Sequence, residues 1–281
     1  MKIFGSKDIK LYIEELLYKK KDELKNRIVI DIPAGNGHST QILKDIGSFV
    51  EPYDLFPEFF NVDGLRCQTA DLCGTLPIQS HYADFVLCQE GIEHLSDQVL
   101  MFKEFNRILK KGGRLLLTTP SYSIFRSKIS YLLSESEYYY KIMPPNEIDS
   151  IWFSNNDTGN DIYYGHIFMI GIQKLRVISK ISGFRIKKVH HFKINHSSLL
   201  LFPFLYPLIF IANCIGYIRA MNKKKDIDKT RKKDVYGEIF RLSIDPRILL
   251  DGHIIVEFEK EYELSEVRST LKGKYSGFSI T

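Results

Sequence analysis

The chain has 281 residues, of which 44% are apolar and 26% are charged, a composition typical of a globular protein with a sizeable core. Its formal net charge of +5 is too small to indicate nucleic-acid binding by itself. Cys67, Cys73, Cys88 and Cys214 form no Cys-x-x-Cys pair, which excludes the usual zinc spacings and favours reduced thiols in a cytosolic protein. The first residues contain no apolar signal core, so we expect a chain that is not secreted by that route.

Short apolar runs alternate with amphipathic stretches in the first half of the chain. The run at 27–32 ends in an acid and a glycine-rich turn, which is typical of a buried strand of a parallel sheet, and Gly47 and the pair Gly112-Gly113 are predicted helix ends. Ligands of such sheets bind at the carboxyl ends of the strands, so the loops that follow the strands are the informative ones. In order, we expect a helix at 9–17, a strand at 27–32, a helix at 39–46, strands at 49–54, 66–70 and 84–89, a helix capped by Ser96 or Asp97, and a strand at 114–119.

The second half of the chain departs from a minimal α/β domain. Residues 121–165 are rich in Tyr, Ser and Asn and are predicted to form an insertion over the active site. A helix at 167–181 and strands at 184–194 and 253–259 resume the alternation. We therefore predict a doubly wound, mostly parallel, seven-stranded α/β sheet, formed by residues 1–196 and 251–281, with an apolar and basic helical insertion at 197–250.

A glycine turn follows the first predicted strand. Asp31 ends that strand, and Gly35 and Gly37 would let the backbone turn tightly and approach a ligand closely. Thr40 stands where the dinucleotide fingerprint requires a third glycine, and no Gly-Lys-Ser/Thr of a P-loop is present. The turn therefore favours a nucleoside ligand over a pyrophosphate.

Two further acids follow the next strands. Asp54 ends the second strand, where a carboxylate can accept both ribose hydroxyl protons. Asp71 follows the third strand, placed for an adenine amino group, with Leu72 beside the ring. The alternative is that Asp31 caps a turn and that Asp54 and Asp71 are solvated loop acids; their joint spacing after successive strands favours the site.

Seven stretches between residues 31 and 120 together resemble the class I S-adenosylmethionine-dependent methyltransferases, in particular a bacterial branch of the methyltransferase type 11 kind. Pro33 and Ala34 depart from it where many members carry Gly-Cys, and so does the Glu-Pro pair before Tyr53. The stretches, in the order and spacing of the family, are DIPAGNG at 31–37, DLFPE at 54–58, ADL at 70–72, LP at 76–77, ADFV at 83–86, EGIEHL at 90–95 and RILKKGG at 107–113.

The resemblance implies a Rossmann-like methyltransferase fold with S-adenosyl-L-methionine as cofactor. It implies that the glycine loop holds the methionine part, the acid after the second strand the ribose, and the acid after the third strand the adenine. The implied cofactor-binding residues are Asp31, Ala34, Gly35, Asn36, Gly37, Asp54, Leu55, Asp71, Leu72, Gln89 and Glu90.

Three residues are candidates for catalysis. His94 lies in the loop after the fourth strand, where the family places the methyl end of the cofactor, and histidine can act as a base near neutral pH. Glu93 or Glu90 would orient it, and His166 would enter the acceptor pocket from the far side. The alternatives are that His94 packs or caps the next helix and that His166 caps a helix. No metal site is predicted.

Residues 197–218 carry no charge and reach the length of a membrane-spanning helix, but Pro203 and Pro207 are expected to break it near its start. Basic residues crowd 219–233. We expect an interfacial or re-entrant element that binds an anionic membrane surface, in a protein that is cytoplasmic and peripheral on the inner face of the membrane. The alternative is a buried helical hairpin or a dimer contact. Nucleic acid is not an expected partner, because no stacking aromatics interleave with the basic residues.

The sequence thus predicts an enzyme that transfers methyl from S-adenosylmethionine to a small-molecule acceptor, such as a hydroxyl of a glycan or lipid-linked intermediate. One alternative is a noncatalytic module that keeps the fold and docks on a membrane or partner. Another is a nicotinamide oxidoreductase on the same sheet, which the missing third glycine disfavours. The sequence specifies neither the acceptor atom, the pathway nor the oligomeric state.

Overall fold

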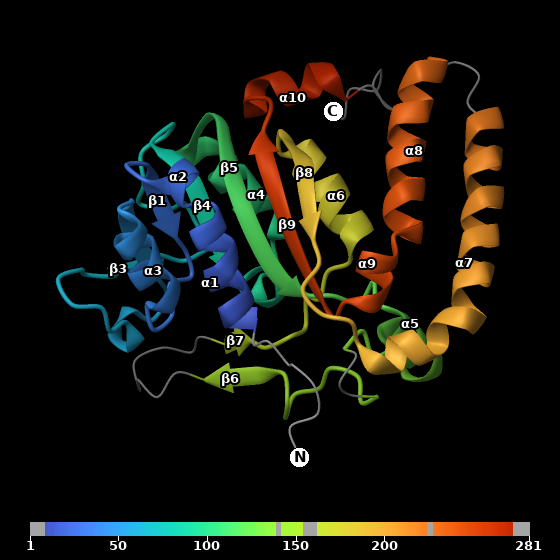
Figure 1. Cartoon of the computed structure of the whole chain (residues 1–281), viewed down its shortest axis with the longest axis horizontal. Helices are drawn as coiled ribbons and strands as arrows, with labels where there is room; N and C mark the ends of the chain where they lie inside the picture. The colour runs from blue at the N-terminus through green and yellow to red at the C-terminus, as the bar shows by residue number, and fades with distance from the viewer. Residues whose placement is uncertain (1–8, 139–141, 154–161, 224–226, 272–281) are drawn as a thin grey trace. The chain divides into compact units, whose positions relative to one another are not determined.

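The computed structural model describes residues 9–138, 142–153, 162–223 and 227–271 (Figure 1). The chain divides into two units. The first, here called the sheet unit, comprises Met1–Thr118, Arg176–Val189 and Ile255–Thr281; the second, the hairpin unit, comprises Thr119–Leu175 and His190–Ile254. Residues 121–165 and 197–250, predicted as two insertions, both lie in the hairpin unit.

A seven-stranded sheet organises the sheet unit, in the order β3-β2-β1-β4-β5-β9-β8. β1 pairs in parallel with β2 and β4, β2 with β3, and β4 with β5, while Figure 1 shows β9 running opposite to both of its neighbours. The predicted mostly parallel sheet is confirmed. Its strands are β1 (Ile28–Asp31), β2 (Phe49–Asp54), β3 (Gln68–Thr69), β4 (Ala83–Gln89), β5 (Leu109–Pro120), β8 (Phe184–His190) and β9 (His253–Lys260).

The helices that accompany the sheet begin and end where local chemistry requires. The Asp97 carboxylate accepts the Leu100 N–H at 2.9 Å and caps α4, and α3 ends at Gly47, whose φ of +89° favours glycine. Buried Phe102 of α4 makes edge contacts with the rings of Phe184 and Phe258 in the core. The helices are α1 (Ile9–Lys19), α2 (Lys21–Leu24), α3 (His38–Ile46), η1 (Pro57–Phe59), η2 (Ile92–His94), α4 (Gln98–Ile108), α6 (Ile172–Ile181) and α10 (Leu264–Thr270).

Some predicted boundaries were wrong. The glycines at 112 and 113 do not end a helix: α4 ends at Ile108, and Leu109 already pairs with Ala83 in the sheet, so both glycines lie within β5. The strand expected at 66–70 covers only Gln68–Thr69, and the helix expected from 167 begins at Ile172.

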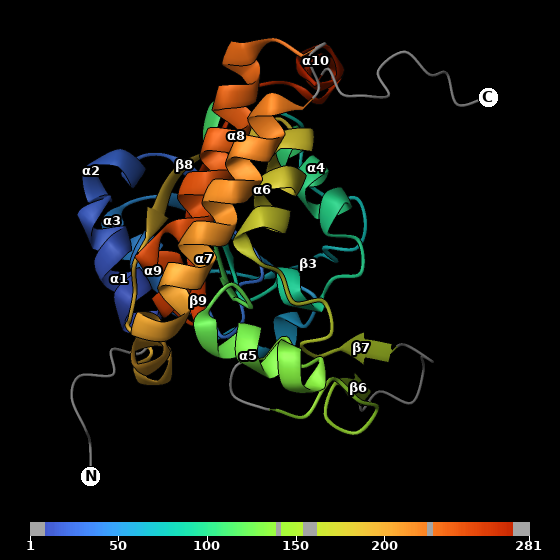
Figure 2. The ribbon, with the colours of Figure 1, turned by 90° about the vertical axis from the view of Figure 1, so that its right-hand side faces the viewer.

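The hairpin unit is mainly helical. Its elements are α5 (Phe125–Ser134), the antiparallel pair β6 (Ile151–Phe153) and β7 (Ile162–Tyr164), α7 (His196–Asn222), α8 (Lys229–Ile244) and α9 (Pro246–Leu250). Phe125, Leu249 and Leu250 form a buried cluster against which one face of α7 packs. Both views show α7 and α8 side by side as a helical hairpin (Figures 1 and 2).

The expectation that Pro203 and Pro207 break the apolar stretch was wrong, because α7 is continuous over 27 residues with both prolines inside it. A proline removes one helical N–H donor and displaces the carbonyl four residues earlier. Both prolines are exposed and lie four residues apart, so these disturbances fall on the outer face, where a bend relieves them. Figure 1 shows the first turns of α7 bending away from the axis of the later turns.

Candidate functional site

The loop that follows β1 is fixed to the end of β2. Gly35 donates its N–H to Asp54 Oδ2 at 2.7 Å, and Ala34 donates its N–H to the Tyr53 carbonyl at 2.9 Å. The second carboxylate oxygen of Asp54 accepts the Phe56 N–H at 2.9 Å. Asp54 is therefore not a solvated loop acid but a buried one that faces the glycine loop. Each of its oxygens still has a lone pair for a further donor.

The two glycines of the loop have different surroundings. Both have a positive φ, +53° at Gly35 and +87° at Gly37. A Cβ on Gly37 would clash with Val62 Cγ2 and lie 2.8 Å from the Phe60 ring, whereas a Cβ on Gly35 would meet no atom within 4 Å. Gly37 is therefore required by protein packing, while Gly35 borders open space that a ligand can fill.

Asp31 is fully buried beneath this loop. Its Oδ2 accepts the Thr40 hydroxyl at 2.6 Å, and its Oδ1 has no hydrogen-bond partner among the described residues. Burial raises the pKa of Asp31 to about 7, the Thr40 hydrogen bond opposes that rise, and the nearby Asp54 carboxylate adds to it. A buried carboxyl with one unused oxygen beside an open glycine suits a cationic donor such as an amino group.

The loops after β3 and β4 reach the same place. A Cβ on Gly91 would lie 3.0 Å from Pro33 Cδ and 3.5 Å from Leu72 Cδ1, so loops from β1, β3 and β4 meet there. Leu72 is buried, as expected of a residue beside a ring. Asp71 is exposed, and its Oδ1 accepts the Cys73 N–H at 2.7 Å, which fixes the turn.

Gln89 ends β4 and Glu90 follows it, at the same edge of the sheet. Gln89 Nε2 donates to Ser39 Oγ at 2.7 Å, which joins β4 to the first turn of α3. Glu90 has a φ of +48°, a left-handed conformation that costs a non-glycine residue energy, and its Oε1 accepts the Thr118 hydroxyl at 2.8 Å. Strain of this kind clusters at functional sites, which supports the loop after β4 as part of one.

Glu93 and His94 lie in η2, directly after that strained residue. The Glu93 carboxylate is fully buried, and its Oε1 lies 3.9 Å from His94 Nε2, while the imidazole is partly exposed. The pair thus places a buried acid beside a partly exposed histidine, the kind of pair in which a carboxylate orients a general base.

His166 lies in the other unit. Its ring makes an edge contact with Tyr138, at a centroid distance of 5.1 Å. It borders a hollow of about 280 Å³ within the hairpin unit, formed by residues of the predicted insertion, Met143 and Asn146 among them. The catalytic role of His166 stays a prediction.

The sequence did not indicate the hydrogen-bond partners of Asp31, Gln89 and Glu90. Thr40 was considered only as a missing glycine, yet its hydroxyl binds Asp31. Ser39 and Thr118 were not singled out, although they bind Gln89 and Glu90. A hydroxyl residue in the first turn of the helix after a glycine loop is the one local signal that could have indicated Ser39 and Thr40.

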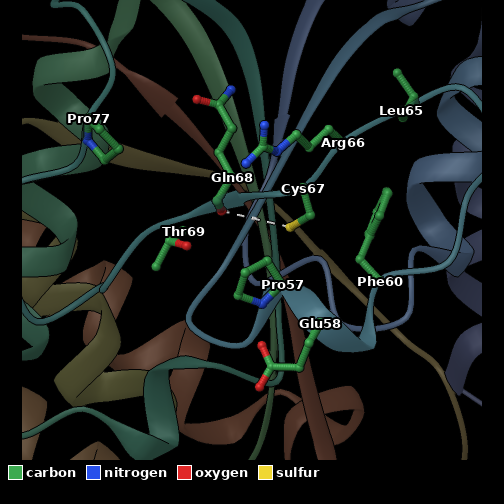
Figure 3. Close-up of a pocket in the computed structure, with 9 residues that line it drawn as sticks. All are labelled: Pro57, Glu58, Phe60, Leu65, Arg66, Cys67, Gln68, Thr69 and Pro77. Carbon is green, nitrogen blue, oxygen red and sulfur yellow. Dashed lines mark hydrogen bonds between the residues drawn. The ribbon is translucent and has the colours of Figure 1, made fainter.

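A hollow of about 850 Å³ in the sheet unit is bordered by η1 and β3 (Figure 3). None of the predicted cofactor or catalytic residues lines it, although the lining residue Phe60 also packs against Gly37 of the glycine loop. Its lining residues are Pro57, Glu58, Phe60, Leu65, Arg66, Cys67, Gln68, Thr69 and Pro77.

Residues 30–117 match the family model described as a methyltransferase domain. The chain is 25% identical over 150 residues to a ubiquinone biosynthesis O-methyltransferase of Coxiella burnetii, covering 50% of this chain and 61% of that protein. It is 27% identical over 127 residues to the Xanthomonas oryzae protein of the same name, covering 41% and 52%. The chain thus spans about half to three fifths of these relatives.

A solved structure supports the fold. The chain is similar to a SAM-dependent methyltransferase from Archaeoglobus fulgidus, with a TM-score of 0.52 and 14% identity over 89% of this chain and 94% of that one.

Proposed function

Because this chain carries a class I S-adenosylmethionine-dependent methyltransferase domain, we propose that it transfers a methyl group from S-adenosylmethionine to a hydroxyl oxygen of a small-molecule acceptor, such as a glycan or lipid-linked intermediate. One observation carries the proposal: the loops after β1, β2, β3 and β4 converge, with Asp54 bonded to Gly35 at 2.7 Å and Gly91 packed against Pro33 and Leu72.

The residues present fit the cofactor. The unused Oδ1 of Asp31 and the open space at Gly35 would receive the methionine part, with Ala34, Asn36 and Gly37 completing the turn. Asp54 would bind the ribose hydroxyls through its remaining lone pairs, with Leu55 beside it. Asp71 and Leu72 would hold the adenine, and Gln89 and Glu90 would close the site at the end of β4.

When bound, S-adenosylmethionine supplies an electrophilic methyl group on a positively charged sulfur. His94 would take the proton of the acceptor hydroxyl as the hydroxyl oxygen bonds to the methyl carbon, while the carbon–sulfur bond breaks and S-adenosylhomocysteine leaves as the neutral thioether. Glu93 stabilises the resulting imidazolium by charge and holds the ring in place. The protein's remaining contribution is to align the methyl donor with the acceptor and to exclude water, which a direct displacement needs most.

Two observations support oxygen as the accepting atom. An acid–histidine pair serves an acceptor that must lose a proton, as a hydroxyl does. The curated relatives named above are O-methyltransferases by their printed names.

Calorimetric titration tests the cofactor. We expect S-adenosylhomocysteine to bind the full chain with 1:1 stoichiometry and NAD to give no heat of binding. Asp54→Asn should weaken S-adenosylhomocysteine about tenfold or more, because the amide is neutral and its nitrogen cannot accept a bond. Binding of NAD alone would point to an oxidoreductase, and binding of neither would point to a noncatalytic module.

Substitution of His94 tests the catalytic role separately. We expect His94→Ala to lower turnover about 100-fold or more while S-adenosylhomocysteine affinity stays within about twofold. The readout is transfer of labelled methyl from S-adenosylmethionine into cell-envelope extracts. Unchanged turnover in His94→Ala would refute the base, while the calorimetric result on the cofactor would stand.

A further inference from the structure

The outer face of α7 is a continuous apolar stripe. Its members recur three or four residues apart, which places them on one face of the helix. Each is between 44% and 75% exposed, and the stripe runs over five turns. We call the following residues the α7 stripe: Leu200, Phe204, Leu208, Ile211, Ile215 and Ile218.

The opposite face of α7 is held firmly by its own unit. Leu205 and Ile209 pack against the buried cluster of α5 and α9, and Phe202 makes an edge contact with Phe125 at 5.8 Å. Further along, Phe210 and Tyr217 both contact the ring of Phe240 in α8. The stripe is therefore a fixed surface of a packed helix, not the side of a fraying segment. Figure 2 shows α7 lying in front of α8.

By length and composition, α7 is long and apolar enough to cross a membrane, and none of its most apolar window is buried. A contiguous apolar surface of this length is unusual on a protein that meets only water.

Positive charge gathers at one end of the hairpin. Arg219 and Lys223 in and after the last turn of α7, and Lys229 and Lys233 at the start of α8, are all exposed. The sequence between the helices adds Lys224 and Lys225. A basic group that adjoins an apolar helix is complementary to a surface that is apolar inside and anionic at its boundary.

We propose that α7 lies in the plane of an anionic lipid bilayer. The α7 stripe then lies at the boundary between headgroups and acyl chains, and the basic turn, defined as Arg219, Lys223, Lys229 and Lys233, lies against lipid phosphates. The packing argues against a span. α8 lies along α7, so a spanning α7 would carry Asp234, Glu238 and Arg241 of α8 into hydrocarbon at several kcal/mol in total. The proposal does not depend on the methyl transfer.

Vesicle flotation of the full chain tests the surface. We expect binding to phosphatidylcholine vesicles that contain 30% phosphatidylglycerol on the order of tenfold tighter than to pure phosphatidylcholine. Leu208→Glu should weaken binding about tenfold or more, because it places a charge in the stripe. Leu11→Glu, at a similarly exposed leucine of α1, is the matched control and should bind as the unaltered chain does.

The basic turn is tested in the same assay. The double variant Arg219→Glu/Lys223→Glu should lose the preference for anionic vesicles, whereas Lys19→Glu, an exposed lysine of α1, should keep it. Equal binding of all variants to both vesicles would overturn the proposal.

Depth measurements separate a helix in the plane from a span. An environment-sensitive dye is attached to Leu200→Cys, Leu208→Cys or Ile215→Cys in a Cys73→Ser/Cys214→Ser background, and lipid-borne quenchers report its depth. Equal depth at all three positions supports the proposal. A deepest position at 208 would indicate a span and overturn it. No spectral shift with vesicles, together with a dimer by light scattering, would mean that a second copy covers the stripe.

Discussion

At the scale of single residues, the two glycines of the loop are needed for different reasons, which the Gly-x-Gly motif alone does not distinguish. Gly37 is closely approached by Val62 and Phe60, while Gly35 faces open space, although both have a positive φ. The first position is required by the fold, and the second is free for a ligand. The pattern Gly-x-Gly shows only that both positions are glycine. The residues that cover Gly37 lie after β2, about 25 residues later in the chain, so the pattern does not reveal them.

We predict opposite effects for alanine at these two positions. Gly37→Ala should destabilise the chain by about 2–4 kcal/mol, through a strained φ and a clash with two side chains. Gly35→Ala should cost only about 1 kcal/mol but weaken S-adenosylhomocysteine binding about tenfold or more, because its methyl occupies the open space. Urea unfolding and calorimetry measure the two effects. Equal loss of stability in both variants would contradict this assignment.

The buried carboxyl of Asp31 makes folding sensitive to pH. Its pKa is raised from 3.8 to about 7, so the folded state holds the proton more tightly than the unfolded state. Below about pH 4 both states are protonated; as pH rises toward 7 only the unfolded state ionises, and stability is lost. Asp31→Asn removes this dependence and keeps an acceptor for Thr40.

We therefore expect the stability of Asp31→Asn, relative to the unaltered chain, to rise with pH between about 4 and 7, by at most about 1.4 kcal/mol per unit. Urea unfolding at pH 4.5, 5.5 and 6.5 measures the difference. Other acids titrate in both proteins and cancel. Parallel stability curves would show that Asp31 ionises normally in the folded chain.

At the scale of elements, one lysine of α8 links the two helices of the hairpin by hydrogen bonds to the end of α7. Lys232 is buried, and its Nζ donates to the Met221 carbonyl at 3.0 Å and the Lys223 carbonyl at 3.2 Å, at the end of α7. Carbonyls in the last turn of a helix lack helical partners, and a cation there also suits the helix dipole.

Lys232→Met should keep the apolar stem but leave these carbonyls without the ammonium, at a cost of about 1–3 kcal/mol confined to the turn. Hydrogen exchange of the last turn of α7 should accelerate, while exchange in the β-sheet stays unchanged. Lys233→Met, at the exposed neighbour, is the control. Acceleration of equal size in both variants would show that the buried contact contributes nothing.

The sequence predicted elements best where local signals agree. The strand at 49–54, the helix from 39 to 46 and the cap at Asp97 rest on short-range chemistry, and the structure confirms them within a residue or so. The helix end predicted at Gly112 and Gly113 was wrong because pairing with β4, a tertiary contact, makes β5 begin before these glycines. The helix break predicted at Pro203 and Pro207 was wrong because packing of α7 on α5, α8 and α9 outweighs the cost of a proline inside a helix.

The candidate site shows the same division. Strand-end positions follow from alternation, so the acids could be located from sequence. The atom that each acid binds could not be predicted, because Thr118 reaches Glu90 from the neighbouring strand β5 and Tyr53 meets the glycine loop through its backbone carbonyl. Such pairings depend on register and rotamer, which residue spacing does not encode.

At the scale of the whole sheet unit, one buried acid joins distant parts of the chain. Glu257 of β9 is 2% exposed, and its oxygens lie 2.8 Å from Lys20 Nζ and 3.2 Å from Arg114 Nη1. Arg114 also pairs with Glu23 of α2. The cluster therefore ties the amino-terminal helices to β5 and to the last strand.

Glu257→Gln should lower the stability of the chain by about 1–3 kcal/mol, because Lys20 and Arg114 lose a buried carboxylate and Lys20 keeps only its longer ion pair with Glu23. Glu259→Gln, two residues along the same strand, should cost under about 1 kcal/mol, since its partners Arg185 and Lys187 are on the surface. Thermal unfolding measures both. A larger shift for Glu259→Gln would contradict the importance of burial.

The position of β9 between β5 and β8 has a consequence during translation. A ribosome releases α7 and α8 before β9, and the roughly 60 residues from the start of α7 to β9 occupy several seconds at about 5–20 residues per second. In that interval β5 and β8 lack the neighbour they share, while the apolar helix has already left the exit tunnel. The nascent chain can therefore meet a lipid surface or a chaperone while its β-sheet is still incomplete.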